Sequence, residues 1–230
     1  MLHTVSPEPM HVKTSQEQEP VAAVSPSRAE TPLQRQLVGA TAARPTALDA
    51  FRQARRTFLA GDRVDMHALA RTLNVDRATL YRWVGSREKL LTEILWSLIS
   101  RTIDTLRATH CAASTADTGQ SPAAAVVTGT VRAVIANQGM QRFIEREGDL
   151  ALRLLTTKAT GFEARLIALI GRLVDEEAAA ERLSTAIPAD DLPYVVVRIM
   201  ESYIYVALIT GEHPDPDRAS RVISALLPPA

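Results

Sequence analysis

The sequence is poor in cysteine, with Cys111 the only one among 230 residues. One cysteine excludes an intramolecular disulfide framework and a metal site built from cysteines alone, and it fits a reducing compartment. Uncharged apolar runs of the roughly 20 residues that a membrane helix needs are also missing. The first 30 residues carry proline and glutamate where an export signal has its apolar segment. We therefore expect a soluble, cytoplasmic protein.

The motifs that mark common enzyme classes are also absent. The sequence has no phosphate-binding P-loop, no Gly-x-Ser-x-Gly motif and no dinucleotide-binding glycine pattern. The pair Glu212-His213 lacks the second histidine of a zinc helix, and His110 beside Cys111 is too small a set for a metal site. We expect no catalytic residues, no cofactor and no bound metal, and thus a protein that is not an enzyme.

The net charge is zero, from 26 basic and 26 acidic residues, but the charge is unevenly distributed. Residues 44–101 hold eleven basic and six acidic residues, an excess of +5, whereas residues 102–230 carry −4. A basic segment joined to a larger acidic one is typical of a polyanion-binding module on a body that does not bind polyanions. Random scatter also produces such a surplus, so the charge pattern alone decides little.

The composition predicts three regions. Residues 1–43 contain five prolines and no aromatic residue, which predicts a disordered tail. Proline is absent from Thr46 to Ser121, where apolar residues recur with helical spacing. We expect a first domain over 44–98 and a second over 99–230.

The expected elements are all helices. Gly61 ends the first, Asp65 and Asp76 are N-caps of the next two, and Asn74 tolerates the left-handed conformation of a tight turn between them. Gly85 ends the third helix and Ser86 caps a long fourth one, 87–108. After a break at 112–121, apolar spacing predicts further helices around 127–135 and over 140–147, 149–158, 162–184, 191–210 and 215–227.

The span from Asp65 to Leu91 has the pattern of a helix-turn-helix. Apolar residues of its two short helices are spaced to pack together, and the small Ala70 lets their axes approach closely. The free face of the second helix then carries residues that suit a DNA major groove: Arg77, Ala78, Thr79, Tyr81 and Arg82. A second group suits phosphates, aided by backbone N–H groups at the start of the fourth helix: Tyr81, Ser86, Arg87 and Lys89.

The order LAxxLxVxxxTLYRWVxSRExLL in this span resembles the DNA-binding domain of the TetR (tetracycline repressor) family of transcriptional regulators. The resemblance is specific over about residues 48–95. It implies that Tyr81 contacts phosphate and that Arg87 or Lys89 is the basic contact at the start of the fourth helix. Two positions depart from the family pattern, since Asn74 stands where glycine is usual and Trp83 where histidine is common. By the same resemblance, the residues that face the bases or the groove would be Arg77, Ala78, Thr79 and Arg82.

The resemblance also implies an architecture and a mechanism. The fold would be all-α, with an N-terminal three-helix DNA-binding domain followed by a helical ligand-binding and dimerisation domain. Two copies would pair through the helices 191–210 and 215–227 and bind a palindromic operator on double-stranded DNA. A small-molecule inducer would release this repressor, and the protein would be prokaryotic, cytoplasmic and nucleoid-associated when bound to DNA.

The body offers weaker signals. The helix 191–210 is apolar nearly all round, which predicts burial on every side, between protomers as well as against its own domain. Its Arg198 and Glu201 are spaced to pair. Core packing or surface solvation is a competing role for each candidate ligand contact. The alternative function is an all-helical protein–protein adaptor whose helix-turn-helix does not read DNA. The candidate ligand contacts are Arg142, Phe143, Arg153, Phe162, Tyr203 and Tyr205.

Overall fold

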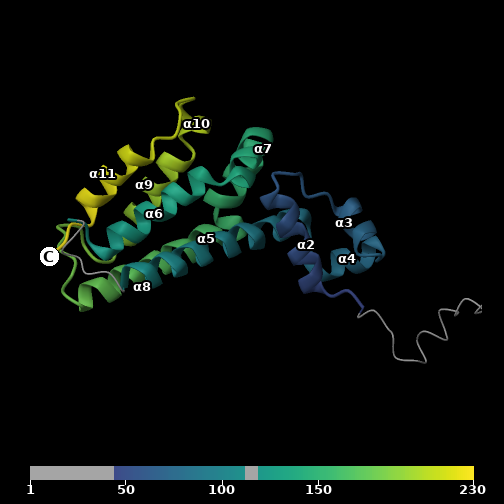
Figure 1. Ribbon diagram of the computed structural model, residues 1–230, viewed down its shortest axis with the longest axis horizontal. Helices are drawn as coiled ribbons and strands as arrows, with labels where there is room; N and C mark the ends of the chain where they lie inside the picture. The colour runs from purple at the N-terminus through teal and green to yellow at the C-terminus, as the bar shows by residue number, and fades with distance from the viewer. Residues whose placement is uncertain (1–43, 112–118) are drawn as a thin grey trace, which may run out of the picture. The chain divides into compact units, whose positions relative to one another are not determined.

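The computed structural model describes residues 44–111 and 119–230, and within these ranges every regular element is helical (Figure 1). The predicted all-α fold is therefore confirmed. The predicted tail over 1–43 and most of the break at 112–121 lie outside the described residues. The elements in chain order are α2 (Ala47–Leu59), α3 (Met66–Thr72), α4 (Arg77–Val84), α5 (Arg87–Cys111), α6 (Pro122–Ala136), α7 (Gln138–Thr156), η2 (Lys158–Thr160), α8 (Phe162–Ala179), α9 (Leu192–Ile204), α10 (Val206–Ile209) and α11 (Pro216–Leu226).

Short-range caps set the starts of the first three helices. The Asp65 carboxylate accepts a hydrogen bond from Ala68 N (2.7 Å), and the Asp76 carboxylate accepts one from Thr79 N (2.8 Å). Both predicted N-caps are confirmed, and each satisfies a backbone donor that the first helical turn leaves without a partner. The α3–α4 turn contains Asn74 at φ +52°, the left-handed conformation expected of it. These local contacts give α3 and α4 their helix-turn-helix geometry.

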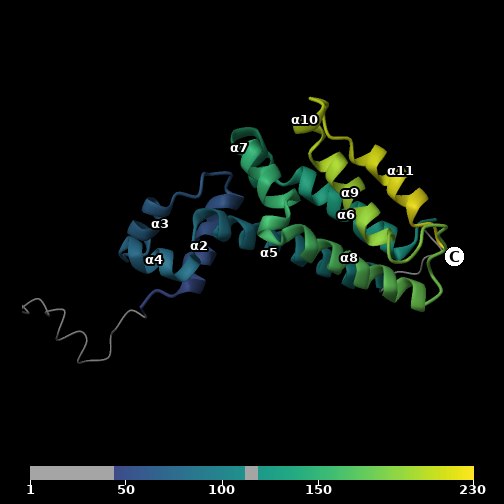
Figure 2. The ribbon, with the colours of Figure 1, turned by 180° about the vertical axis from the view of Figure 1, so that it is seen from behind.

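The helix α5 belongs to both parts of the structure. It follows α4 directly and continues into the body, where it packs along α6 (Figures 1 and 2). Its inward side is buried from Leu91 and Ile94, beside the helix-turn-helix, to Ile103 in the body. Burial of each such aliphatic side chain contributes about 1.5–3 kcal/mol. The predicted boundary at residues 98 and 99 therefore falls inside one continuous helix.

The remaining helices form the body. The helix α6 packs against α5 and α11, and α8 packs against α9. In both views α9, α10 and α11 lie far from α3 and α4 (Figures 1 and 2). Within the described ranges, each helix is too short or too polar to span a membrane.

Two predicted helices are shorter in the structure than expected. The predicted helix 191–210 breaks at Tyr205 into α9 and α10, and in the single chain Tyr194 and Ile209 are 52% and 62% exposed, so the predicted burial between two copies stays a prediction. Apolar composition alone does not show which side of a helix meets a neighbour. The helix predicted over 162–184 ends at Ala179. Glu181, two residues later, has a φ of +54°, which is outside the helical range.

The helices predicted over 140–147 and 149–158 form one run, α7, with a kink in it. Glu147 has non-helical angles (φ −137°, ψ 42°), one residue before the expected gap. The kink divides α7 into a half that touches α2 and a half that packs in the body. It therefore marks the point where the body meets the helix-turn-helix region.

A glycine allows α7 to approach α2 closely. A β carbon on Gly139 would overlap Phe58 O and lie 3.1 Å from Leu59 Cα, so backbone atoms would have to move. Gly171 in α8 differs, since an added β carbon there meets only the Pro193 side chain, at 3.6 Å. Gly139 is thus required by packing, whereas Gly171 is not.

We predict that Gly139→Ala lowers the free energy of unfolding by about 1–3 kcal/mol because it forces α7 away from α2. The matched Gly171→Ala should raise it by up to ~1 kcal/mol, since alanine favours a helix interior more than glycine does. Urea unfolding followed by circular dichroism measures both. Equal stabilisation by the two substitutions would contradict the close approach.

Candidate nucleic-acid interface and internal cavity

The helix α4 presents a polar, partly cationic face. Leu80 is completely buried against the rest of the helix-turn-helix, while Arg77, Ala78 and Arg82 are exposed on the other side. Within the described residues, neither arginine forms an ion pair. Both guanidinium groups are therefore available for hydrogen bonds to an external acceptor such as a guanine edge.

Thr79 is held in one orientation by the N-cap of its own helix. Its hydroxyl donates to Asp76 Oδ2 (2.6 Å), and its backbone N–H donates to Asp76 Oδ1 (2.8 Å). These hydrogen bonds hold the pKa of the Asp76 carboxyl below its ordinary value, so the cap stays ionised. With its hydroxyl hydrogen occupied, Thr79 has its methyl group left for an apolar contact, such as one to a thymine methyl.

A second exposed set surrounds the start of α5. Tyr81 is 40% exposed, and Ser86 and Lys89 are exposed beside it. Ser86 Oγ accepts from Lys89 N (3.1 Å), which confirms Ser86 as the cap and leaves its hydroxyl hydrogen free. Arg71 of α3 was missed by the sequence reasoning although it is exposed and, in the described part of the chain, unpaired. The sequence could have identified Arg71 because it occupies a polar position on the side of α3 that faces away from the apolar residues.

Arg87 lies elsewhere, at the contact between α5 and α7. Its Nη1 and Nη2 donate to the two oxygens of Glu147 at 2.8 and 2.7 Å, and its Nε donates to Val64 O at 2.6 Å. All three types of guanidinium nitrogen are thus occupied, and the side chain is only 19% exposed. Arg87 was predicted as a phosphate contact, and the structure instead places it between the α2–α3 loop and the kink of α7.

Two further arginines of α7 reinforce this contact. Arg142 Nη1 donates to Ala60 O and Arg146 Nη1 donates to Gly61 O, each at 3.1 Å. These carbonyls belong to the end of α2, where an α-helix leaves its last carbonyl groups without intrahelical partners. Hydrogen bonds from Arg87 hold the pKa of the Glu147 carboxyl below its ordinary value, against the opposing effect of burial. We call the contacts of Arg87, Arg142, Arg146 and Glu147 the α7 junction.

A double-mutant cycle of Arg87→Ala and Glu147→Ala should give a coupling free energy of about 1–3 kcal/mol in urea unfolding, because the pair is bidentate and shielded from water. The matched cycle uses the ion pair of Arg153 in α7 with Glu88 in α5, whose Nη2 and Oε1 atoms are 2.6 Å apart. These two side chains are 59% and 53% exposed. That pair should couple by less than ~1 kcal/mol. Equal couplings would contradict a special role for the α7 junction.

Comparison with known proteins finds the same family for the C-terminal half and for the fold. A model of the tetracyclin repressor-like C-terminal domain matches residues 118–228. The solved structure of the R. erythropolis transcriptional repressor QsdR, from the TetR family, is 27% identical and has a TM-score of 0.66. That alignment covers 79% of this chain and 93% of QsdR. The described chain thus has the fold of a TetR-family protein, and residues 118–228 match the C-terminal domain of that family.

Two other comparisons add little. A putative TetR family transcription regulator from Shewanella sp. PV-4 aligns with 80% of this chain and 99% of its own length, at 13% identity and a TM-score of 0.43. None of the curated proteins matches the chain. The chain has the fold of a TetR-family transcription regulator, in which α3 and α4 are the helix-turn-helix.

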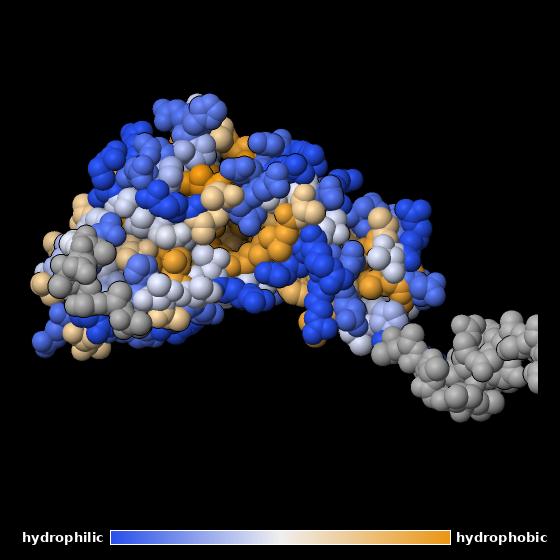
Figure 3. All heavy atoms as spheres, in the orientation of Figure 1, coloured by the Kyte–Doolittle hydropathy of each residue, from blue (hydrophilic) through white to orange (hydrophobic). Residues whose placement is uncertain are grey.

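The body of the protein contains a cavity of about 90 Å³. Five helices, α5 to α9, contribute to its walls, and Figure 3 shows hydrophobic side chains around a hollow where α5, α6 and α7 meet. Its apolar lining consists of Leu95, Leu98, Ile99, Ala133, Val134, Met140, Leu155, Phe162, Leu166, Met200 and Ile204, and its polar lining of Thr102, Asn137, Glu201 and Tyr205.

The charged group of the cavity is Glu201, which is 8% exposed. Arg198 Nη2 lies 2.8 Å from Glu201 Oε2 and 2.8 Å from Glu163 Oε1, so the predicted pairing of Arg198 with Glu201 is confirmed but shared with a second carboxylate. Burial raises the pKa of Glu201 to about 7, with Arg198 opposing and Glu163 adding to the shift. The pKa of the buried Tyr205 hydroxyl is also raised, chiefly by burial, so this group stays protonated.

Two of the six predicted ligand contacts line the cavity, namely Phe162 and Tyr205. Arg142 lies in the α7 junction, and Phe143 packs edge-on against Phe58 with ring centroids 5.6 Å apart. Tyr203 is half-buried outside the lining. The sequence reasoning missed Asn137 and Glu201 as lining residues, because it selected aromatic residues and arginines.

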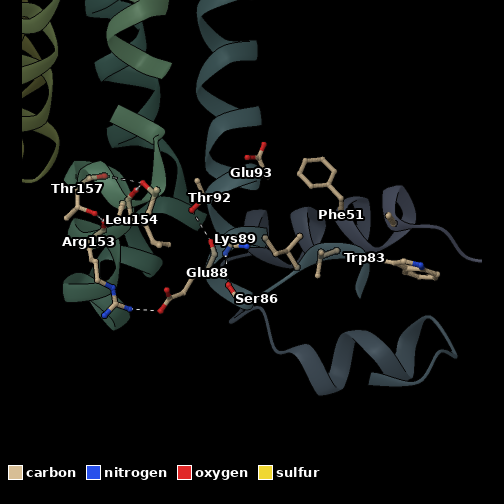
Figure 4. A pocket seen from close by; sticks show the side chains of 15 residues that line it. Phe51, Trp83, Ser86, Glu88, Lys89, Thr92, Glu93, Arg153, Leu154 and Thr157 are labelled. Carbon is tan, nitrogen blue, oxygen red and sulfur yellow. Dashed lines mark hydrogen bonds and ion pairs between the residues drawn. The ribbon is translucent and has the colours of Figure 1, made fainter. Parts of the chain in front are cut away.

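Arg153, the remaining predicted ligand contact, borders a separate open groove between the helix-turn-helix and the body. In Figure 4 its guanidinium points toward Glu88, with which it forms the ion pair already described. Phe51 and Trp83 lie on the helix-turn-helix side of this groove, which has a volume of about 620 Å³. Among the described residues, no group of three or more His, Cys, Asp or Glu is placed to hold a metal ion.

Glu201→Gln should make stability less dependent on pH. Because the folded protein holds a proton on Glu201 that the unfolded chain releases between about pH 4.5 and 7, the wild type loses stability as pH rises through this window. The free energy of unfolding of Glu201→Gln minus that of the wild type should therefore increase by on the order of 2 kcal/mol from pH 5 to pH 8. Thermal unfolding at both pH values measures it, with exposed Glu212→Gln as the control. A difference that does not change with pH would contradict the burial effect.

Proposed function

We propose that this TetR-family regulator is a cytoplasmic homodimeric repressor that a small molecule releases from a palindromic operator. The exposed face of α4 is the single observation that carries the proposal, because its Arg77 and Arg82 form no ion pair with any residue that the structure describes. A helix with such a face on a helix-turn-helix suits the major groove, and Tyr81, Ser86 and Lys89 beside it suit phosphates. QsdR, the relative at 27% identity, is described as a transcriptional repressor.

Dimerisation through α9 to α11 is supported by their outer surface. The helices α9 and α11 pack against each other, and Tyr194 and Ile209 on this part of the chain are two of the four exposed large hydrophobic residues of the described ranges. A second copy would cover these side chains and place two α4 helices on one duplex. The symmetry of such a dimer matches a palindromic site.

The helices around the cavity provide the route for induction. Both α5 and α7 line it, α5 continues directly from the helix-turn-helix, and α7 holds α2 through the α7 junction. A ligand that enlarges the cavity would displace these helices. It releases DNA only if it binds more tightly to the state in which the α4 helices are wrongly spaced.

Selection of bound sequences from a random pool of DNA duplexes tests the proposal. We expect a palindrome whose half-sites lie about one helical turn apart, ~34–36 Å. The affinity should fall by on the order of 10³ over a fourfold rise in salt if six or more phosphates are contacted. An adaptor that does not read DNA predicts no preference over competitor DNA, and this result would overturn the repressor proposal.

Two substitutions separate base reading from phosphate binding, with fluorescence anisotropy as the measurement. Arg82→Ala should reduce the preference for the selected site by a factor that corresponds to ~1–3 kcal/mol. Lys89→Ala should weaken binding to all duplexes alike and lower the salt slope by about one. Arg172→Ala, on an exposed part of α8, is the control and should change neither. Equal weakening of selected and random DNA by Arg82→Ala would contradict base reading.

A further inference from the structure

We propose that the cavity between α5 and α9 takes a small uncharged molecule with an apolar body and one acceptor oxygen, such as a carbonyl, which binds the Tyr205 hydroxyl. The inference rests on the proposed function, because it names the chemical class of the inducer. It is drawn from the polar groups that the cavity walls leave without partners and from the charges around them.

Two walls of the cavity offer hydrogen-bond donors. Tyr205 is 5% exposed, and its hydroxyl makes no hydrogen bond to another of the described residues. Asn137 Oδ1 accepts from Met140 N (2.9 Å), which leaves the Asn137 amide with N–H groups to donate. The remaining lining hydroxyl, that of Thr102, already donates to Leu98 O (2.9 Å). The available groups are therefore suited to a ligand acceptor.

Charge in the cavity disfavours an ionic ligand of either sign. An anion would meet the Glu201 carboxyl, and the nearest cation, Arg198, is already shared between Glu201 and Glu163. A cation would have to compete with Arg198 for Glu201 and would lose its water among eleven apolar lining residues. Burial already moves the pKa of Glu201 toward its uncharged form, which can donate a further hydrogen bond.

The size of the cavity limits the ligand. A cavity of roughly 150 Å³ holds benzene, and the 90 Å³ here is smaller. Met140 and Met200 line it, and methionine side chains change shape readily. A molecule of about six non-hydrogen atoms would enter by moving these side chains, and a larger one would also have to move helices.

Cyclopentanone is a probe of this size and chemistry, and cyclopentylammonium matches it in shape with a positive charge. The full chain, with methyl-13C methionine and without DNA, is titrated with each probe at pH 7 by NMR. Cyclopentanone should shift the methyl signals of Met140 and Met200, with the Met66 signal of α3 as an internal control. Its dissociation constant should be at least tenfold lower than those of cyclopentylammonium and cyclopentanecarboxylate.

Tyr205→Phe keeps the ring and removes the hydroxyl, so it should weaken cyclopentanone binding about tenfold. The matched control is Tyr203→Phe, two residues away and outside the lining, which should leave the affinity unchanged. Thermal unfolding confirms that both variants fold. If Tyr205→Phe binds like the wild type, if an ionic probe binds more tightly, or if Met140 and Met200 do not respond to cyclopentanone, the inference is overturned.

These outcomes are separate from those of the proposed function, because the NMR titration contains no DNA. Binding of cyclopentanone without DNA recognition would retain the ligand site and remove the repressor role. DNA recognition without cyclopentanone binding would retain the regulator and overturn the ligand class.

Discussion

Both oxygens of Glu147 bind the guanidinium of Arg87, and this ion pair ties the start of α5, directly after the helix-turn-helix, to α7 of the body. Arg87 begins the helix that follows α4, and its Nε also holds the loop before α3 through Val64 O. Glu147 is the residue at which α7 loses helical geometry. The carboxylate at the kink meets the guanidinium, so α7 is in direct contact with the elements on either side of α4.

The energy of this junction suits a switch. Moving a two-state protein from 1:99 to 99:1 requires a differential affinity of about 10⁴-fold, or ~5.5 kcal/mol. The best very small ligands contribute up to ~1.5 kcal/mol per non-hydrogen atom, and most of that is common to both states. A ligand of the size that the cavity admits can therefore switch DNA binding only if the two states are close in energy. A junction of one bidentate pair and three arginine–carbonyl hydrogen bonds, beside the edge-on packing of Phe143 on Phe58, is small enough to allow two such states.

The helix-turn-helix was predictable because its signals are local. Asp65 and Asp76 cap helices through backbone groups three residues away, and Asn74 adopts the left-handed conformation within its own residue. The junction was not predictable, because Arg87 and Glu147 are 60 residues apart and Glu147 had no distinguishing neighbours. The cavity was found only in part for a similar reason. Which side chains face it depends on the rotation of five packed helices, so choosing by aromatic type identified Phe162 and Tyr205 but not Asn137.

The charge excess of +5 in residues 44–101 counts charges without their positions, and the structure separates them. Successive residues of an α-helix are rotated by about 100°, so Arg87 and Lys89 at the start of α5 point in nearly opposite directions. Arg87 turns inward to Glu147, and Lys89 stays exposed beside Ser86. Family resemblance left either residue as the basic phosphate contact, and helix geometry divides the two roles. At the start of α5, Arg87 binds the body while Lys89 faces outward with α4. The first turn of α5 therefore contacts both α7, which lines the cavity, and the face proposed to bind DNA.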